Sequence, residues 1–359
     1  MTDGAVQRPS LFAPSSTGTL FGRGTDVAVF GGSAAVSLGL LAGGSALGIL
    51  DGDAPPWVWL LCIVGVDVSH VWATLYRVYL DGAELRRRPL LYAGTPMACY
   101  AAGTALHATD PMLFWRVLAY VAVYHFIRQQ AGWVRLYHRR DESIGRADRA
   151  IDMLAVYAAT IYPVLHWHGH LPRAFAWFMH GDFVDAVGAA AAGWLQPVYW
   201  AIMLAFCARR VQQLATRQRV HTGTTLVVIS TWACWHLGII TFDSDYAFTV
   251  TNVIIHGIPY FALTLRYGRM RGAMGAPLLG RLSRAGVLPM LALLLAIALI
   301  EEGLWERYVW HDHTWLAGSA PGLSELSLAL LVPLLSLPQA THYVLDGIVW
   351  RRRGNPLLA

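Results

Sequence analysis

Ten stretches of the chain are apolar over about 20 residues, the length that an α-helix needs to cross the hydrocarbon core of a bilayer. Residues 1–25, which are rich in Pro, Ser, Gly and Thr, predict a disordered cytoplasmic tail ahead of one transmembrane helical domain, residues 26–359. The expected fold is an all-α, polytopic membrane helix bundle. Its ten predicted helices lie near residues 26–50, 57–80, 89–108, 111–134, 150–167, 188–208, 223–241, 246–265, 285–305 and 326–350.

The composition agrees with this assignment. The chain has 359 residues, of which 56% are hydrophobic and 14% are charged, and a soluble protein of this length is less apolar. Its four cysteines all lie in apolar stretches and form no C-x-x-C spacing. Neither a disulfide framework nor a thiolate zinc site is therefore indicated.

The arginines predict the topology. The sequence contains 27 arginines and no lysine, and 23 of the arginines fall in the tail, in alternate connections or at the C-terminus. The opposite connections hold only Arg173 and Arg307. Because basic residues are retained on the cytoplasmic side, both termini should be cytoplasmic, and the location should be a bacterial inner membrane. Short arginine clusters in loops do not indicate a nucleic-acid partner.

Polar residues that a bilayer tolerates poorly recur inside four of the predicted helices. A charged side chain near the bilayer centre costs roughly 2.5 to 3.5 kcal/mol even on lenient insertion scales, so something must offset it. Each of the four helices carries a histidine with a polar partner three or four residues away, on the same helix face. The pairs are His70 with Asp67, His125 with Gln129, His256 with Asn252, and His342 with Asp346.

The four histidines are expected to meet at one level of the membrane. All lie in even-numbered helices, which run from outside to inside, and their depths agree within about one to two turns at 1.5 Å per residue. We therefore expect one buried metal site with His70, His125, His256 and His342 as ligands. The four polar partners would orient the rings or serve as additional ligands. Taken singly, each histidine also fits a role in holding helices together.

The residue types limit the choice of metal without fixing it. Imidazole with some carboxylate suits Zn, Fe, Cu or Mn, and the absence of placed thiolates disfavours Cu(I). One ion or two are both compatible with the pattern. Each helix supplies one histidine at one height, which disfavours two stacked haems and leaves a single haem open.

Further residues are expected near the site. Trp72, Tyr260 and Tyr343 would shape an apolar pocket beside it. Pro333 and Pro338 predict a break in the last helix just before His342, since proline removes backbone hydrogen bonds.

Arg128 lies between His125 and Gln129 and is costly against lipid. It is expected either to pair with a carboxylate or to hold an anionic substrate group. The candidate carboxylates are Asp67, Asp81 and Asp346.

A second possible metal cluster lies on the outer side. Histidines there have metal-capable chemistry. Alternating histidines in a loop are equally typical of a hydrated, flexible segment. The residues concerned are His166, His168, His170, His311 and His313.

Four short patches give the chain a resemblance to the bacterial β-carotene dioxygenase family. The patches include Tyr124–Phe126 (YHF) and His342–Arg351 (HYVLDGIVWR). Members of that family combine an early helix bearing His and Asp, a His-Phe pair, and a closing helix with His, Asp, an aromatic residue and Arg. The resemblance implies non-haem iron that uses O2 on a lipid-soluble isoprenoid. By position, it implies that His70, His125, His256 and His342 are the iron ligands.

Three hypotheses about function follow. The first is a membrane metal-dependent oxidoreductase, with non-haem iron and O2, that acts on a lipid-soluble substrate and draws on an electron-donor protein where the reaction requires one. The second is a divalent metal transporter that uses the same histidines as a midplane ion site. The third is a haem-binding or structural membrane subunit.

Overall fold

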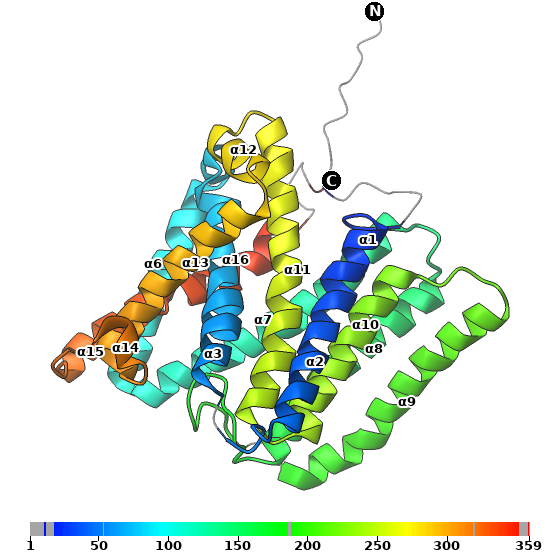
Figure 1. Cartoon of the computed structure of the whole chain (residues 1–359), viewed down its shortest axis with the longest axis horizontal. Coiled ribbons are helices and arrows are strands. Elements are labelled where there is room, and N and C mark those ends of the chain that lie inside the picture. The colour runs from blue at the N-terminus through cyan, green and yellow to red at the C-terminus, as the bar shows by residue number, and fades with distance from the viewer. Residues whose placement is uncertain are drawn as a thin grey trace, which may run out of the picture.

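The chain folds as a bundle of long helices, shown in the computed structural model of Figure 1. The structure describes residues 11, 18–52, 54–185, 188–318, 320–351 and 358. Within these residues there are helices and no β-strand, which confirms the expected all-α class. Most of the predicted tail, residues 1–10 and 12–17, lies outside the described part, and Arg23–Asp26 already form the first helix.

The described helices join into ten long segments, because several follow one another without a break and differ only in α- or π-type hydrogen bonding. Short helices lie in three of the connections: α5 (Gly82–Arg87), α12 (Pro277–Arg284) and α14 (Thr314–Ala317). The first two long segments are α1 (Arg23–Asp26) with η1 (Val27–Gly32) and α2 (Ser33–Ala46), then α3 (Pro56–Val58) with η2 (Trp59–Val68), α4 (Ser69–Thr74) and η3 (Leu75–Tyr79). The others are α6 (Pro89–Thr109), α7 (Pro111–Arg140), α8 (Arg146–Gly169), α9 (Gly188–Ala215), α10 (Thr222–Trp235) with η4 (His236–Thr241), α11 (Asp245–Ala273), α13 (Val287–Trp305) with η5 (Glu306–Trp310), and α15 (Glu325–Leu335) followed by α16 (Leu337–Val349).

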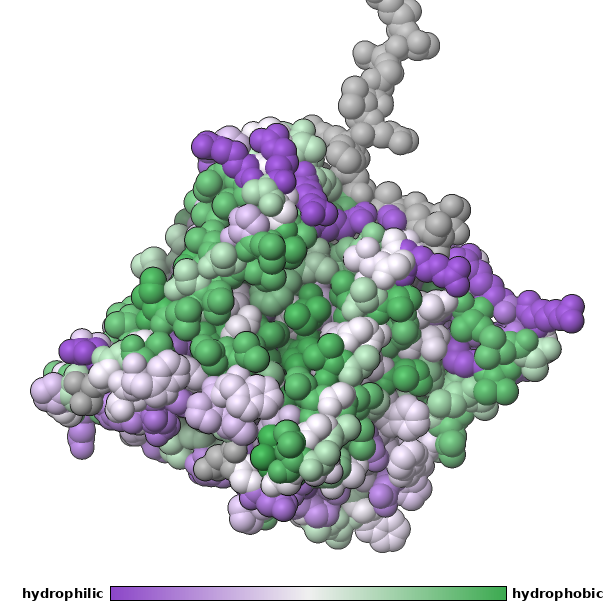
Figure 2. Space-filling view, in the orientation of Figure 1, coloured by the Kyte–Doolittle hydropathy of each residue, from purple (hydrophilic) through white to green (hydrophobic). Residues whose placement is uncertain are grey.

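Eight of the ten segments are long and apolar enough to cross a membrane. Figure 2 shows an apolar belt between two hydrophilic ends of the molecule. The chain is thus a multi-pass membrane protein by the length and composition of its helices. α6 and α7 do not belong to that set of eight, so the predicted count of ten spans stays a prediction.

The segments alternate in direction, so the arginine-rich ends gather on one side. The Tyr137 hydroxyl at the end of α7 donates to Asp26 at the start of the first segment, at 2.8 Å. The Tyr267 hydroxyl near the end of α11 donates to Asp81, just after η3, at 2.6 Å. Hydrophilic residues mark this side at the top of Figure 2. Its assignment to the cytoplasm stays a prediction.

α11 is the central helix. Its apolar window is 83% buried, whereas no other candidate span exceeds 50%. It packs against α2, α10 and the segment that contains η2 and α4. Residues on any face of α11 therefore point into the protein.

The predicted break before His342 is confirmed. α15 ends at Leu335, Ser336 forms a turn, and α16 begins at Leu337, with Pro338 in its first turn. Proline suits that position because the first turn of a helix needs no N–H donor.

A buried ion pair at the arginine-rich end connects the residue after η3 to α11. Asp81 is 1% exposed and accepts hydrogen bonds from Arg271 Nε at 2.5 Å and from the Tyr267 hydroxyl. Burial alone would raise the pKa of Asp81, but these hydrogen bonds outweigh it and hold the pKa below its ordinary value. A carboxyl with a lower pKa in the folded state stabilises the fold at neutral pH. That stabilisation is lost as the pH falls through the folded-state pKa.

We expect Asp81→Asn to lower the free energy of unfolding at pH 7 by about 3 kcal/mol, because it leaves Arg271, whose side chain is only 12% exposed, without its counter-charge. The melting temperatures of both proteins in detergent between pH 7 and pH 3 measure this loss of stability. The difference in melting temperature between wild type and variant should narrow as the pH falls. Glu142→Gln is the control, since Glu142 is exposed and forms no ion pair among the described residues. A difference that stays constant down to pH 3 would contradict the expectation.

Candidate metal centre

Four segments each bring one histidine to the middle of the bundle. His70 lies on α4, His125 on α7, His256 on α11 and His342 on α16. Their exposed fractions are only 0 to 3%. The predicted convergence of the four imidazoles is confirmed, and their role as metal ligands stays a prediction.

The four rings stand at the corners of a rough square. The ring centroids of His70 lie 4.6 Å from His256 and 4.8 Å from His342. Those of His125 lie 5.1 Å from His256 and 4.7 Å from His342. His70 and His125 face each other along a diagonal of 6.4 Å. The Nε2 atoms point inward, at 3.1 Å between His70 and His256 and at 3.2 Å between His125 and His342.

This spacing fits a metal ion. Two nitrogens bound to one zinc ion at roughly 2.0–2.1 Å lie about 3 Å apart when they subtend a right angle, close to the 3.1 and 3.2 Å of these two pairs. Ligand atoms of His70, His125 and His256 all lie within 4.8 Å of one another, whereas His342, which approaches His125, falls outside that group of three. The described residues contain no second group of three His, Cys, Asp or Glu side chains that meets this criterion. Two Nε2–H···Nε2 hydrogen bonds are the alternative interpretation of the short distances.

A haem held by His70 and His125 does not fit among the same four rings. Haem iron takes its protein ligands on the two faces of the macrocycle. With His70 and His125 in those places, the macrocycle would occupy the plane in which His256 and His342 stand. The square therefore favours one ion surrounded by imidazoles.

Three polar side chains lie behind the rings. The Thr74 hydroxyl is 2.6 Å from His342 Nδ1 and so fixes the orientation of that ring. A carboxylate oxygen of Asp67 is 3.4 Å from His70 Nδ1, and one of Asp346 is 3.7 Å from His125 Nδ1. Carboxylates in these positions would offset the charge of a cation bound among neutral imidazoles.

Two predicted pairings differ from the structure. Asp346 faces His125 on another helix, not His342 one turn away on its own helix. The Asn252 amide donates to the carbonyl of Phe248 at 2.9 Å. Gln129 interacts with the His125 side chain, as predicted, and its amide also donates to the backbone carbonyl of His256 at 2.8 Å. An i, i+4 spacing places two side chains on one helix face, but in a packed core the nearest partner often lies on the facing helix.

Among the described residues other than the four histidines, no polar side chain forms a hydrogen bond with the His256 ring. Other contacts hold this ring in place. The ring of Phe126 stacks on it at 3.5 Å with an interplanar angle of 4°. Gly257 allows the close approach of α11 to η2, because a Cβ at this position would lie 2.5 Å from Val66 Cγ1. Small residues permit such contacts between membrane helices. This approach brings His256 within reach of His70.

We expect Gly257→Leu to separate α11 from η2 and to weaken metal binding roughly tenfold or more, since overpacking of a core typically costs about 1 to 3 kcal/mol. Metal titration of the chelator-treated protein measures the effect. Gly94→Leu is the control, because a Cβ there would meet nothing within 4 Å. Unchanged metal affinity in the Gly257 variant would contradict the close-approach argument.

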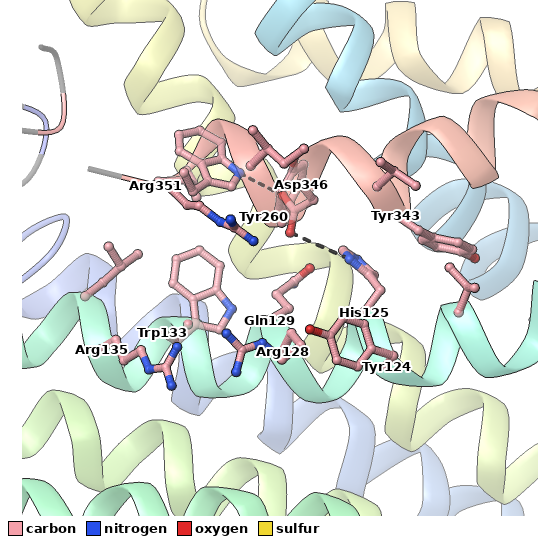
Figure 3. Close-up of a pocket in the computed structure, with 18 of the residues that line it drawn as sticks. Tyr124, His125, Arg128, Gln129, Trp133, Arg135, Tyr260, Tyr343, Asp346 and Arg351 are labelled. Atoms are coloured by element: carbon pink, nitrogen blue, oxygen red, sulfur yellow. Dashed lines mark hydrogen bonds and ion pairs between the residues drawn. The ribbon is translucent and has the colours of Figure 1, made fainter. Parts of the chain in front are cut away.

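A cavity of about 590 Å³, here called the inner cavity, lies between α7, α11 and α16 on one side of the histidines (Figure 3). His125, Tyr260, Tyr343 and Asp346 form part of its wall. Val121, Tyr124 and Val344 also line it and are 36%, 65% and 41% exposed, so it opens sideways between α7 and α16. The predicted pocket role therefore applies to Tyr260 and Tyr343.

Trp72 does not line the inner cavity. Its indole N–H donates to Glu301 at 2.5 Å. Arg128 does line the cavity, and it donates to the Tyr157 hydroxyl at 2.6 Å. Among the described residues Arg128 forms no ion pair, so the predicted pairing with Asp67, Asp81 or Asp346 is wrong.

A second cavity of about 680 Å³, here called the outer cavity, lies on the other side of the histidines. Asp67 and Phe126, which contact His70 and His256, belong to its wall. Glu302, Glu306 and Asp312 make the wall acidic. The histidine square thus lies between an acidic outer cavity and an inner cavity of different character.

The five outer histidines occupy separate environments instead of one site. His168 Nε2 is 2.9 Å from the Tyr120 hydroxyl, and the His166 and His170 rings stack on each other at 3.9 Å. His313 Nδ1 is 2.9 Å from a Glu306 carboxylate oxygen, and His311 follows η5. In the part of the chain that the structure describes, they form no group of three ligands.

Sequence reasoning missed Thr74, Phe126 and Gly257. Thr74 is four residues after His70, so its shared helix face was a usable signal. Phe126 and Gly257 directly follow a site histidine, but stacking and close approach depend on which helices are neighbours.

Comparison of the chain with known family models, curated proteins and solved structures gave no match.

Proposed function

We propose that the four histidines hold a redox-active metal ion, best matched by one non-haem iron, and that the protein is an oxidoreductase of a bacterial inner membrane that acts on a lipid-soluble substrate with O2. The observation that carries the proposal is the meeting of four buried histidine rings beside a laterally open cavity. The proposal includes ten membrane spans and cytoplasmic termini, as the arginine distribution predicts.

The donor set supports iron-type chemistry. Four imidazoles with two carboxylates behind them suit Fe, Mn, Cu or Zn, and neither thiolates nor a nucleophilic serine constellation accompany them. A square of ligands leaves its two faces unfilled by histidine. When bound there, the ion would supply a site for the binding and activation of O2.

The protein itself would supply access and orientation. Tyr124 and Val344 lie at a lateral opening between α7 and α16, where a molecule dissolved in the bilayer can enter without crossing water. Tyr260 and Tyr343 would hold it against the histidines, since their rings are 5.3 Å from His342 and 5.1 Å from His125. A dioxygenase of this kind would need no electron-donor protein, whereas a monooxygenase would.

Transport of a divalent metal is the second candidate, favoured by the acidic outer cavity above the histidines. The inner cavity gives it less support. Its wall contains four arginines and one carboxylate, which repel a cation that leaves toward the cytoplasm. A structural role for the histidines, through two Nε2–H···Nε2 bonds, is the third candidate.

Elemental analysis and an optical spectrum of the purified protein distinguish these candidates. The proposal predicts about one Fe per chain and no Soret band. Zinc or copper that chelators remove readily would favour transport, a Soret band would favour haem, and no metal in metal-replete preparations would favour the structural role. Oxygen uptake in the presence of a lipid extract then tests for turnover.

A further inference from the structure

We propose that the inner cavity binds an amphiphile with an anionic head group, which Arg128, Trp133 and Arg351 hold while its apolar chain runs along α7 to the histidines. This inference rests on the proposed function only where it makes the amphiphile the substrate, because binding of the amphiphile itself needs no metal. The ligand is defined by its chemistry, a carboxylate or phosphate head group on a long apolar chain.

The charges of the inner cavity are separated along its length. Arg128, Arg135, Arg139 and Arg351 line it, and its one acidic residue is Asp346. Asp346 lies at the histidine end, 3.7 Å from His125 and 2.8 Å from the Trp350 indole nitrogen. The other end of the cavity therefore carries an excess of positive charge.

Three of these arginines lack an acidic partner. Arg128 and Arg135 both donate to the neutral hydroxyl of Tyr157, at 2.6 and 3.4 Å. Arg351 stands at the end of α16 and points into the cavity (Figure 3). In the described ranges none of the three forms an ion pair. Guanidinium groups bind carboxylate and phosphate through paired hydrogen bonds, so this set matches an anion.

A buried polar atom on the cavity wall also lacks a partner. Trp133 is 2% exposed, and its Nε1 has no hydrogen-bond partner among the described residues. Such a group typically costs about 1 to 3 kcal/mol, so a ligand that pairs with it gains affinity. Figure 3 shows Trp133 between Arg128 and Arg351, where its N–H can donate to a head group that both arginines contact.

The position of Arg128 indicates a binding site and differs from that of the arginines that usually flank membrane helices on the cytoplasmic side. Flanking arginines extend toward the membrane surface, whereas Arg128 is one helical turn from His125. Trp133 is eight residues from His125, about 12 Å along α7. Leu263, Val344 and Ile348 supply apolar wall along the cavity. Its volume lies within the roughly 300–1,000 Å³ of small-molecule sites.

The test is binding of palmitate to the full chain in nanodiscs of zwitterionic lipid, with hexadecanol as the uncharged analogue. We expect saturable binding of about one palmitate per chain, at least tenfold tighter than hexadecanol. Arg351→Gln and Arg128→Gln should each weaken palmitate binding at least tenfold, and Trp133→Phe should weaken it severalfold. Arg351 is exposed at a helix end, so its variant keeps the fold even if the Arg128 variant does not. Arg146→Gln, an exposed arginine outside the cavity, should bind as wild type.

Phosphatidylglycerol is the competing source of the same head-group charge. If it displaces palmitate in wild type but not in Arg351→Gln, the anionic-amphiphile site is supported and the bilayer is a source of its ligand. Equal affinity for palmitate and hexadecanol, or unchanged binding in both arginine variants, would overturn the proposal. The measurement is repeated after chelation, with metal content recorded. If the protein holds metal but shows no selective palmitate binding, this inference is wrong and the proposed function stands. If the protein binds palmitate selectively but takes up no metal, the proposed function is wrong and this inference stands.

Discussion

Replacing His70 or His342 with alanine is expected to abolish bound metal. Each removes one of four facing rings, whose Nε2 atoms lie 3.1 Å apart between His70 and His256 and 3.2 Å apart between His125 and His342. The three remaining imidazoles are buried, so water cannot easily take the place of the lost ligand. Even the loss of a residue behind a ligand lowers metal affinity roughly 10- to 100-fold, and the loss of a ligand should exceed that. The metal-to-chain ratio after purification measures the effect.

His166→Ala is the matched control. That histidine stacks on His170 at the outer end of α8 and belongs to no metal group among the described residues. Its variant should retain the wild-type metal content. Full retention of metal in either site variant, with an unchanged melting temperature, would show that the square does not hold the ion.

Filling the inner cavity should remove turnover and leave the metal in place. Gly132 lines this cavity on α7, and a Cβ there would meet nothing within 4 Å. A tryptophan at this position can therefore extend into the cavity without a clash near its backbone. We expect Gly132→Trp to lower substrate-dependent O2 uptake, and palmitate binding, at least tenfold at unchanged metal content.

Gly94→Trp provides the comparison for that variant. Gly94 is an exposed glycine of α6 whose Cβ would also meet nothing within 4 Å, and it does not line the cavity. Its variant should behave as wild type. Wild-type O2 uptake in Gly132→Trp would mean that substrate reaches the histidines by another route.

Much of the fold was predictable because hydrophobicity along the chain reports directly on membrane helices. The predicted stretch 285–305 corresponds to α13 at Val287–Trp305, part of one of the eight candidate spans. The stretch 111–134 was cut short, since α7 continues to Arg140. Its last turns carry arginines, which lower hydropathy but are good helix formers. Apolarity therefore shows which part of a helix is buried or in contact with lipid, but it does not show at which residue the helix ends.

The candidate site was predictable in part for a related reason. A polar residue in a membrane helix needs a partner, so four helices with a histidine at one depth implied a meeting point. Which partner serves which ring was not predictable. Asp346 contacts His125 instead of His342 because the rotation of α16 against α7 decides the contact, and spacing along one helix carries no such information. The inner cavity depends likewise on three helices far apart in sequence.

X-ray absorption spectroscopy at the edge of the bound metal tests the central claim most directly. For the wild-type protein, the square of imidazoles predicts about four nitrogen neighbours at about 2.0 to 2.2 Å, with the multiple scattering that histidine rings produce. In His342→Ala reloaded with excess metal, any ion that binds should have fewer imidazole neighbours. A first shell without histidine scattering, or one that is the same in both proteins, would contradict the assignment of the metal to these four residues.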